Sequence, residues 1–200
     1  MKIICVARNY PLHAKEMGSE PPSQPLFFLK PSTAWAASGE IPYPLFTQQL
    51  EYEGELVFRI AKSGKSISPS DAMGWVDALT VGIDFTARDL QAKFKKEGLP
   101  WDMAKGFDNS AWWGAWLPIP PGWEALPFSL QKNGKTVQKG TGKEMIFPLP
   151  RLLSEASQYF SLEPGDVLFT GTPAGVGPIS RGDILKAFWG EQVVGEVRII

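Results

Sequence analysis

The sequence predicts a β-rich α+β fold, built of short strands with a few short helices, and three observations carry this prediction. The chain holds 20 glycines and 18 prolines among 200 residues, which exceeds the average usage of about 12% for the two together. These residues are spread between short apolar runs and do not form a low-complexity block. The apolar runs are mostly four to eight residues long, as in strands joined by tight turns.

The predicted strands follow one another along the chain with only two clear helical patterns between them. Asn133-Gly134 stands between alternating residues of segment 130–137 and predicts a hairpin there. A second hairpin is expected at the C-terminus, turning at residues 189–192. Seven further segments have the composition of strands: 2–6, 26–30, 55–60, 81–85, 167–170, 184–189 and 192–199.

Helical periodicity is confined to two segments, 87–97 and 150–160. The first is closed by Gly98 and Pro100, which end helices. Residues 68–73 add a turn of helix. Because no repeat or linker interrupts the chain, we expect a single domain over residues 1–200, with residues 1–50 forming a loop-rich N-terminal lobe.

Composition excludes several classes of protein. The net charge is −1 with no stripe of Lys or Arg, which argues against a nucleic-acid partner. No apolar stretch reaches the ~18 residues of a membrane-spanning helix, and the N-terminus resembles a first strand more than a signal peptide. The single cysteine, Cys5, permits no internal disulfide and lies in an apolar run. We therefore expect a cytoplasmic protein in which Cys5 is a packing residue.

Acidic residues in two segments are candidate metal ligands. Glu51, Glu53 and Glu55 alternate, so in a strand they would project from one face. Like charges on one face are destabilising unless a cation neutralises them, and Mg²⁺ or Mn²⁺ prefers such oxygen ligands. A solvated strand face is the alternative. Asp84, at the end of the predicted strand 81–85, is either structural or a third ligand.

Two pairs of polar residues are spaced for helical contact. Arg88 and Gln91 lie three positions apart after Thr86, a candidate N-cap, and together would bind a substrate carboxylate or carbonyl. His13, the only histidine, has the same spacing from Glu16. A carboxylate beside an imidazole raises its basicity, as a water-activating base requires. A solvated first turn and a surface ion pair are the respective alternatives.

A glycine-rich loop follows the predicted strand 167–170. It includes Thr172, whose hydroxyl, with the loop's N–H groups, would approach an anionic group. The segment matches no Walker or dinucleotide fingerprint, so a nucleotide is not inferred.

The order and spacing of these segments resemble the fumarylacetoacetate hydrolase family over nearly the whole chain, most closely its short acylpyruvase and oxaloacetate decarboxylase branch. The DFTARDLQ run and the C-terminal glycine-rich segment are its most specific motifs. The matching segments are NYPLHAKE from Asn9, PLFFLKPST from Pro25, YEGELVFRI from Tyr52, GIDFTARDLQ from Gly82, WDMAKGFD from Trp101, the hairpin with MIF at Met145, and LEPGDVLFTGTPAGVG from Leu162.

The resemblance implies a mixed β-sandwich or roll, a homodimer, and a role for each matched position. The implied ligands of an Mg²⁺ or Mn²⁺ ion are Glu53, Glu55 and Asp84. The implied catalytic residues are His13 and Glu16, on a lid segment that orders over the site, and Lys105. The implied substrate-binding residues are Arg88, Gln91 and Thr172.

The implied activity is hydrolysis of a C–C bond in acylpyruvate-type 2,4-diketo acids through a metal-stabilised pyruvate enolate. Oxaloacetate decarboxylase and oxaloacetate keto-enol tautomerase activities are the alternatives, because all three reactions share this enolate. A catalytically inert metal-binding relative is a further alternative. The chain departs from the family after Asp108, where Trp112, Trp113 and Trp116 stand. These tryptophans would either reshape the pocket for a small keto-acid substrate or bury a dimer surface.

Overall fold

Three β-sheets and four short α-helices make up the computed structural model, which describes residues 1–200. The predicted β-rich α+β fold is confirmed. The α-helices are α1 (Pro11–Glu16), α2 (Arg88–Glu97), α3 (Asp102–Lys105) and α4 (Leu149–Tyr159), and the 3₁₀ turns are η1 (Ser32–Ala34), η2 (Ala72–Trp75), η3 (Trp123–Ala125) and η4 (Gly142–Glu144).

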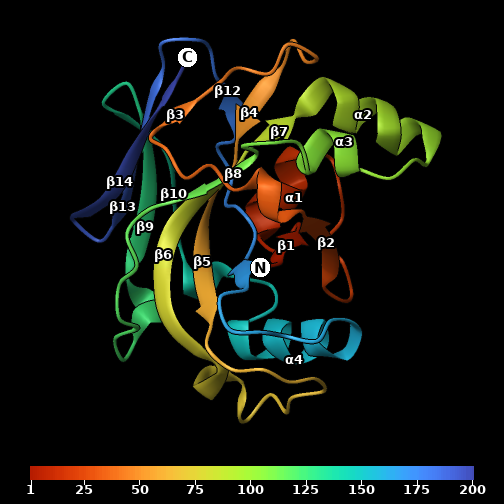
Figure 1. Cartoon of the computed structure of the whole chain (residues 1–200), viewed down its shortest axis with the longest axis vertical. Helices are drawn as coiled ribbons and strands as arrows, with labels where there is room; N and C mark the ends of the chain where they lie inside the picture. Colours follow the sequence, from red (N-terminus) through yellow and green to blue (C-terminus); the bar gives the residue numbers. More distant parts are fainter.

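The largest sheet has six strands and joins segments that are far apart along the chain. Its order is β2 (Leu26–Lys30), β1 (Ile3–Ala7), β11 (Val167–Phe169), β5 (Gly54–Ile60), β6 (Val76–Asp84) and β8 (Ala111–Trp113). β1 and β11 are parallel and the other neighbours antiparallel. Figure 1 shows β6 as a long, strongly curved strand.

Two smaller sheets complete the fold. The five-stranded sheet has the order β10 (Lys135–Thr141), β9 (Pro127–Lys132), β13 (Ile184–Trp189), β14 (Gln192–Ile199) and β3 (Glu40–Ile41). The three-stranded sheet has the order β12 (Gly177–Pro178), β4 (Leu50–Tyr52) and β7 (Thr86–Ala87). Both predicted hairpins are present, as β9–β10 and β13–β14.

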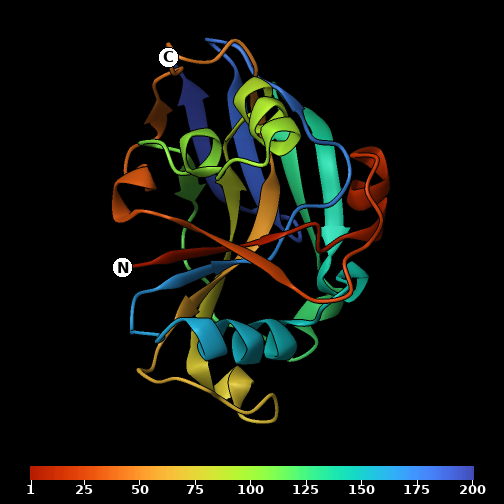
Figure 2. The ribbon, with the colours of Figure 1, turned by 90° about the vertical axis from the view of Figure 1, so that its right-hand side faces the viewer.

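The main hydrophobic core lies between the six-stranded and five-stranded sheets, where β6 contacts β13 and β5 contacts β9. Phe58 of β5, Phe128 of β9 and Leu185 of β13 are buried there. Helix α4 lies across one end of the sheets (Figures 1 and 2) and buries Leu152 and Leu153. Full burial of each such side chain is worth about 1.5–3 kcal/mol.

Several predicted boundaries differ from the structure. β6 begins at Val76, five residues before the predicted start. The prediction missed this part of the strand because Asp77 interrupts the apolar run. In the structure Asp77 pairs with Arg59 on the neighbouring strand. The predicted turn of helix at 68–73 is observed at Ala72–Trp75. Thr86 is not the N-cap of α2: it lies in β7, paired with Glu51. None of the helices has the length and apolar character that a membrane crossing needs.

Candidate active site

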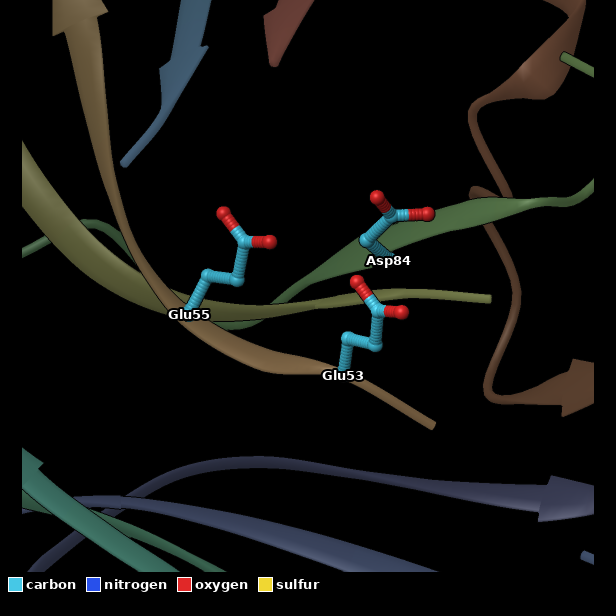
Figure 3. A group of neighbouring side chains, drawn as sticks. All are labelled: Glu53, Glu55 and Asp84. Atoms are coloured by element: carbon cyan, nitrogen blue, oxygen red, sulfur yellow. The ribbon is translucent and has the colours of Figure 1, made fainter. Parts of the chain in front are cut away.

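The register of β5 against β6 brings three carboxylates together at one end of the six-stranded sheet. Gly54 pairs with Ile83, and the amide of Asp84 donates to the carbonyl of Glu53 at 2.9 Å. Glu53 and Asp84 therefore lie side by side, with Glu55 two positions along β5. Ligand oxygens of Glu53, Glu55 and Asp84 all lie within 4.8 Å of one another, and Figure 3 shows the carboxylates directed into a common space.

Glu51 does not belong to this triad. The chain leaves the three-stranded sheet after β4 and enters the six-stranded sheet at Gly54, so the expected single strand carrying three glutamates is wrong. Glu51 accepts hydrogen bonds from Gln49 at 2.9 Å and from Arg88 Nε at 2.7 Å.

Buried cations compensate two of the three carboxylates. Lys105 Nζ donates to Glu53 and Asp84, both at 2.9 Å, and to Thr86 Oγ1 at 2.6 Å. Arg88 donates to Glu53 at 2.6 Å. No cation lies within ion-pair distance of Glu55, which accepts only the amide of Gly171 at 2.6 Å.

These contacts separate the acidities of the two glutamates. Burial alone would raise the pKa of Glu53, but the positive charges of Lys105 and Arg88 outweigh burial and lower it. Burial and the negative charges of Asp84 and Glu53 raise the pKa of Glu55 well above its ordinary value. Burial also disfavours the charged form of Lys105, but Asp84 and Glu53 reverse this effect and raise its pKa.

The donor set fits a hard divalent cation. It consists of carboxyl oxygens alone, the ligands that Mg²⁺ and Mn²⁺ prefer. Glu55 has no side-chain cation as a partner, so a bound metal ion would favour its ionised form. Asp84 Oδ1 lies 2.7 Å from Lys30 Nζ and forms an ion pair with it. The same oxygen accepts no hydrogen bond within the protein. Its lone pairs therefore remain able to bind a metal.

Arg88 and Gln91 lie on the first turn of α2 and are buried. Besides Glu51 and Glu53, Arg88 donates to Gln91 Oε1 at 2.6 Å, so each nitrogen of the guanidinium group has an acceptor. Arg88 thus orients the glutamates. Because Arg88 donates to Oε1, the contact fixes which end of the Gln91 amide is the oxygen. The amide nitrogen, Nε2, has no partner in the protein and is available to a substrate oxygen.

His13 reaches the same site from α1, which begins at Pro11 as the sequence predicts. Its Nδ1 lies 3.2 Å from Glu16 Oε2, and the side chain is 7% exposed. The amide of Gly175 holds Glu16 at 3.1 Å. The contact through Nδ1 leaves Nε2 of His13 free to exchange a proton.

Thr172 belongs to the loop after β11, and its hydroxyl is already engaged. It donates to the carbonyl of Gly54 and accepts from Gln138 Nε2, both at 2.8 Å. Gln138 also accepts the amide of Gly54 at 2.7 Å. These bonds hold the loop against the start of β5, so Thr172 fixes the backbone between Glu53 and Glu55.

A pocket that is partly open to solvent lies over the triad. Of the nine residues predicted from the sequence, Glu16 and Asp84 do not line it directly. The other seven do: His13, Glu53, Glu55, Arg88, Gln91, Lys105 and Thr172.

The tryptophans after Asp108 do not reshape this pocket, contrary to one of the two expectations. Trp112 is buried in the core, Trp113 stacks on Trp35 with ring centroids 5.2 Å apart, and Trp116 packs under Arg59. The pocket wall contains Trp101 instead. Trp35 is 42% exposed, so the aromatic group lies at the protein surface beside β8.

Sequence reasoning missed three buried polar residues that support the site. Lys30 is 1% exposed and contacts Asp84. Gln138 holds the Thr172 loop, and Asn9 donates to the carbonyl of Thr170 at 2.8 Å and accepts the amide of Phe147 at 2.8 Å. The only available signal was their place in or beside the matched segments, because their partners lie 34 or more residues away along the chain.

Comparisons with known proteins agree with this geometry. The family model described as Fumarylacetoacetate (FAA) hydrolase C-terminal matches residues 2–198. The mitochondrial oxaloacetate tautomerase FAHD1 of Bos taurus is 42% identical over 188 residues, covering 92% of this chain and 85% of that protein.

Two solved structures share the fold over the whole chain. A putative fumarylacetoacetate hydrolase family protein from Yersinia pestis CO92 has a TM-score of 0.95 at 37% identity, with 93% of that chain covered. The fumarylpyruvate hydrolase of Pseudomonas aeruginosa, solved with Mn²⁺ and pyruvate, has a TM-score of 0.92 at 37% identity, with 89% of that chain covered.

Proposed function

Because this chain belongs to the fumarylacetoacetate hydrolase family, we propose that it is a divalent-metal-dependent enzyme that cleaves a C–C bond of acylpyruvate-type 2,4-diketo acids. The observation that carries the proposal is one pocket lined by two carboxylates of the triad, by Lys105 and by His13. A carboxylate cluster, a base and a buried cation are the groups that such a reaction requires.

Glu53, Glu55 and Asp84 would hold Mg²⁺ or Mn²⁺, with Mg²⁺ as our first choice. When bound, such a cation polarises the keto oxygen of a 2-keto acid and favours negative charge on that oxygen. Lys105 presents its ammonium group to the same space and would stabilise the same developing charge. The free amide nitrogen of Gln91 would donate to a substrate oxygen and fix the keto acid in the pocket.

His13 would act as the base. Its Nε2 would take a proton from water as the water oxygen attacks the distal carbonyl carbon, C4, while Glu16 stabilises the imidazolium through Nδ1. The bond between C3 and C4 then breaks, and its electron pair stays with C3 as the enolate of pyruvate. Return of the proton from His13 to C3 gives pyruvate and a carboxylic acid. In this scheme Arg88 and Thr172 hold Glu53 and the β5 backbone in place.

Oxaloacetate is the second candidate substrate, because the bovine relative is named an oxaloacetate tautomerase. Tautomerisation requires only that a proton move between C3 and the enol oxygen, and decarboxylation reaches the pyruvate enolate of the hydrolase scheme by loss of CO₂. Neither reaction needs water to attack. The two candidates therefore differ in their demand on the pair formed by His13 and Glu16.

The test is pyruvate release from acetylpyruvate and from oxaloacetate, measured side by side with Mg²⁺, with Mn²⁺ and with EDTA. Faster EDTA-sensitive release from acetylpyruvate supports the hydrolase. Faster release from oxaloacetate supports a decarboxylase, and ketonisation of enol-oxaloacetate without pyruvate release supports a tautomerase. No turnover of either compound, despite tight metal binding, would indicate a catalytically inert relative.

Two substitutions separate the roles of the base and the metal ligands. His13→Ala should abolish hydrolysis and leave the Kd for Mn²⁺ nearly unchanged, whereas Glu53→Ala should remove both activity and metal binding. Equal loss of Mn²⁺ affinity in His13→Ala, measured by calorimetry, would contradict the assigned role of His13.

We further propose that the protein is cytoplasmic and that it forms a homodimer. The buried free thiol of Cys5 suits a reducing compartment such as the cytoplasm, although the bovine relative is named as mitochondrial. The exposed Trp35–Trp113 stack would suit a homodimer interface. Sedimentation of the protein and of Trp35→Ala tests the dimer.

A further inference from the structure

The pocket contains two cations that the proposed chemistry does not use. Arg8 and Lys95 both line it, and neither side chain forms an ion pair or hydrogen bond within the protein. Every other cation in the pocket already has a carboxylate partner: Arg88 pairs with Glu53, and Lys105 with Glu53 and Asp84.

The positions of these cations on their elements direct them to the pocket. Lys95 follows Arg88 and Gln91 at the helical spacing i, i+3 and i+7, so the three side chains share one face of α2. At 1.5 Å per residue, Lys95 stands about 10 Å along the helix from Arg88. The helix face thus runs from the carboxylate triad at Arg88 outward to Lys95.

Arg8 enters the pocket from the end of β1. Its φ of +56° is in the left-handed region, which residues other than glycine and asparagine adopt uncommonly. The pocket wall includes Val6, Ala7 and Arg8 in succession. The turn of the backbone at Arg8 therefore leaves its side chain in the pocket wall.

The surroundings of Lys95 indicate that Lys95 and Arg8 face the same part of the pocket. Its Nζ lies 5.3 Å from the ring centroid of Trp101, another residue of the pocket wall. Partial burial and the positive charges of Arg88 and Arg8 lower the pKa of Lys95. Repulsion between neighbouring cations is relieved when an anion binds between them.

We propose that Arg8 and Lys95 form an anion subsite that binds the distal carboxylate of the substrate, so that the enzyme prefers 2-keto acids with a carboxylate at each end. This inference rests on the proposed function, because it places the keto-acid end at the triad. Both cations lie in the pocket wall and have no protein acceptor. Charged hydrogen bonds from an arginine and a lysine would fix the far end of such a substrate.

The experiment compares substrates that differ only in the distal charge. For the tautomerase reaction the pair is oxaloacetate and its 4-methyl ester. For hydrolysis the pair is a 2,4-diketo acid ending in a carboxylate and its methyl ester. We expect kcat/KM to favour the free acid by at least about tenfold in the wild-type protein loaded with Mn²⁺.

Arg8→Gln and Lys95→Gln should each raise KM for the free acid severalfold, leave the ester unchanged, and in combination bring the ratio close to one. Lys96→Gln is the matched control, because Lys96 is the next residue on the same helix and does not line the pocket. Thermal melting of each variant establishes that it is folded.

Equal rates for acid and ester in the wild-type protein would overturn the subsite and leave the proposed function standing. Variants that slow both substrates equally would also overturn it. If neither pair is turned over, the proposed function fails, and calorimetric binding of the same acid and ester decides the subsite separately: equal affinity for the two refutes it.

Discussion

Among single residues, Lys30 gives the strongest stability prediction. Its ammonium group is buried and lies 2.7 Å from Asp84, and it donates to the carbonyl of Ser110 at 3.0 Å. Removing Lys30 would leave Asp84 with Lys105 as its only cation, which Glu53 shares, and breaking a buried ion pair is strongly destabilising. Lys30→Met should therefore lower the free energy of unfolding by about 3 kcal/mol in metal-free protein, measured by urea denaturation.

A double-mutant cycle distinguishes this ion pair from simple loss of packing. Asp84→Asn removes the charge left behind, so the double variant should be more stable than the sum of the single losses by at least about 1 kcal/mol. Lys186→Met is the control, because its partner Glu196 is exposed and such pairs contribute little. Additive losses would show that Lys30 matters only for packing.

Cys5 gives a second prediction at this scale. The thiol is fully buried in β1, and burial raises its pKa well above the ordinary value. Since the thiolate is the reactive form, labelling by a charged aromatic disulfide reagent should be slow in the folded protein at pH 8 and remain slow at pH 9. Labelling should be complete in denaturant. Rapid reaction of the folded protein at pH 8 would show that β1 opens readily.

At the scale of elements, the loop after β11 should tolerate no side chain at its first glycine. Gly171 has a φ of +97°, and a Cβ there would lie 2.8 Å from Cβ of Asn9. Gly171→Ala should therefore cost at least about 2 kcal/mol of folding free energy and weaken Mn²⁺ binding, because the Gly171 amide holds Glu55.

Gly165→Ala is the matched control for that loop. Gly165 has a similar φ of +87° but no atom within 4 Å of an added Cβ, so it should cost only about 1 kcal/mol and leave the Kd for Mn²⁺ unchanged. Urea denaturation and metal titration measure both effects. Equal behaviour of the two variants would mean that the contact between the loop and Asn9 does not set the geometry of Glu55.

How much the sequence predicts depends on where each element gets its hydrogen bonds. The hairpin at Asn133-Gly134 carries its own turn signal and was predicted, whereas β4, β7 and β12 are two or three residues long and exist only through pairing with distant segments. Thr86 resembled a helix cap because local spacing cannot show that its hydroxyl accepts from Lys105. Lys30 was missed for the same reason, since a lysine ending a strand is usually solvated.

At the scale of the whole molecule, the candidate site joins the sheets. Glu53 directly precedes β5, Glu55 lies at its start, and Asp84 ends β6 in the same sheet. Arg88 connects Glu53 to Glu51 in the three-stranded sheet, and Gly171 connects Glu55 to the loop after β11. A cation bound there contacts segments that separate on global unfolding, so binding should stabilise the entire fold.

This coupling predicts a large thermal shift on metal binding. A ligand at 100 times its Kd that binds only the folded state adds about 2.7 kcal/mol, which for a chain of this size raises Tm by about 5–10 °C. Mn²⁺ should produce such a shift in calorimetry, and EDTA should reverse it. Glu55→Gln should abolish the shift because it removes the carboxylate that no protein cation compensates. Glu196→Gln should retain the shift, because Glu196 is an exposed residue of β14. A shift of equal size in both variants would place the cation elsewhere and remove the triad from the proposed chemistry.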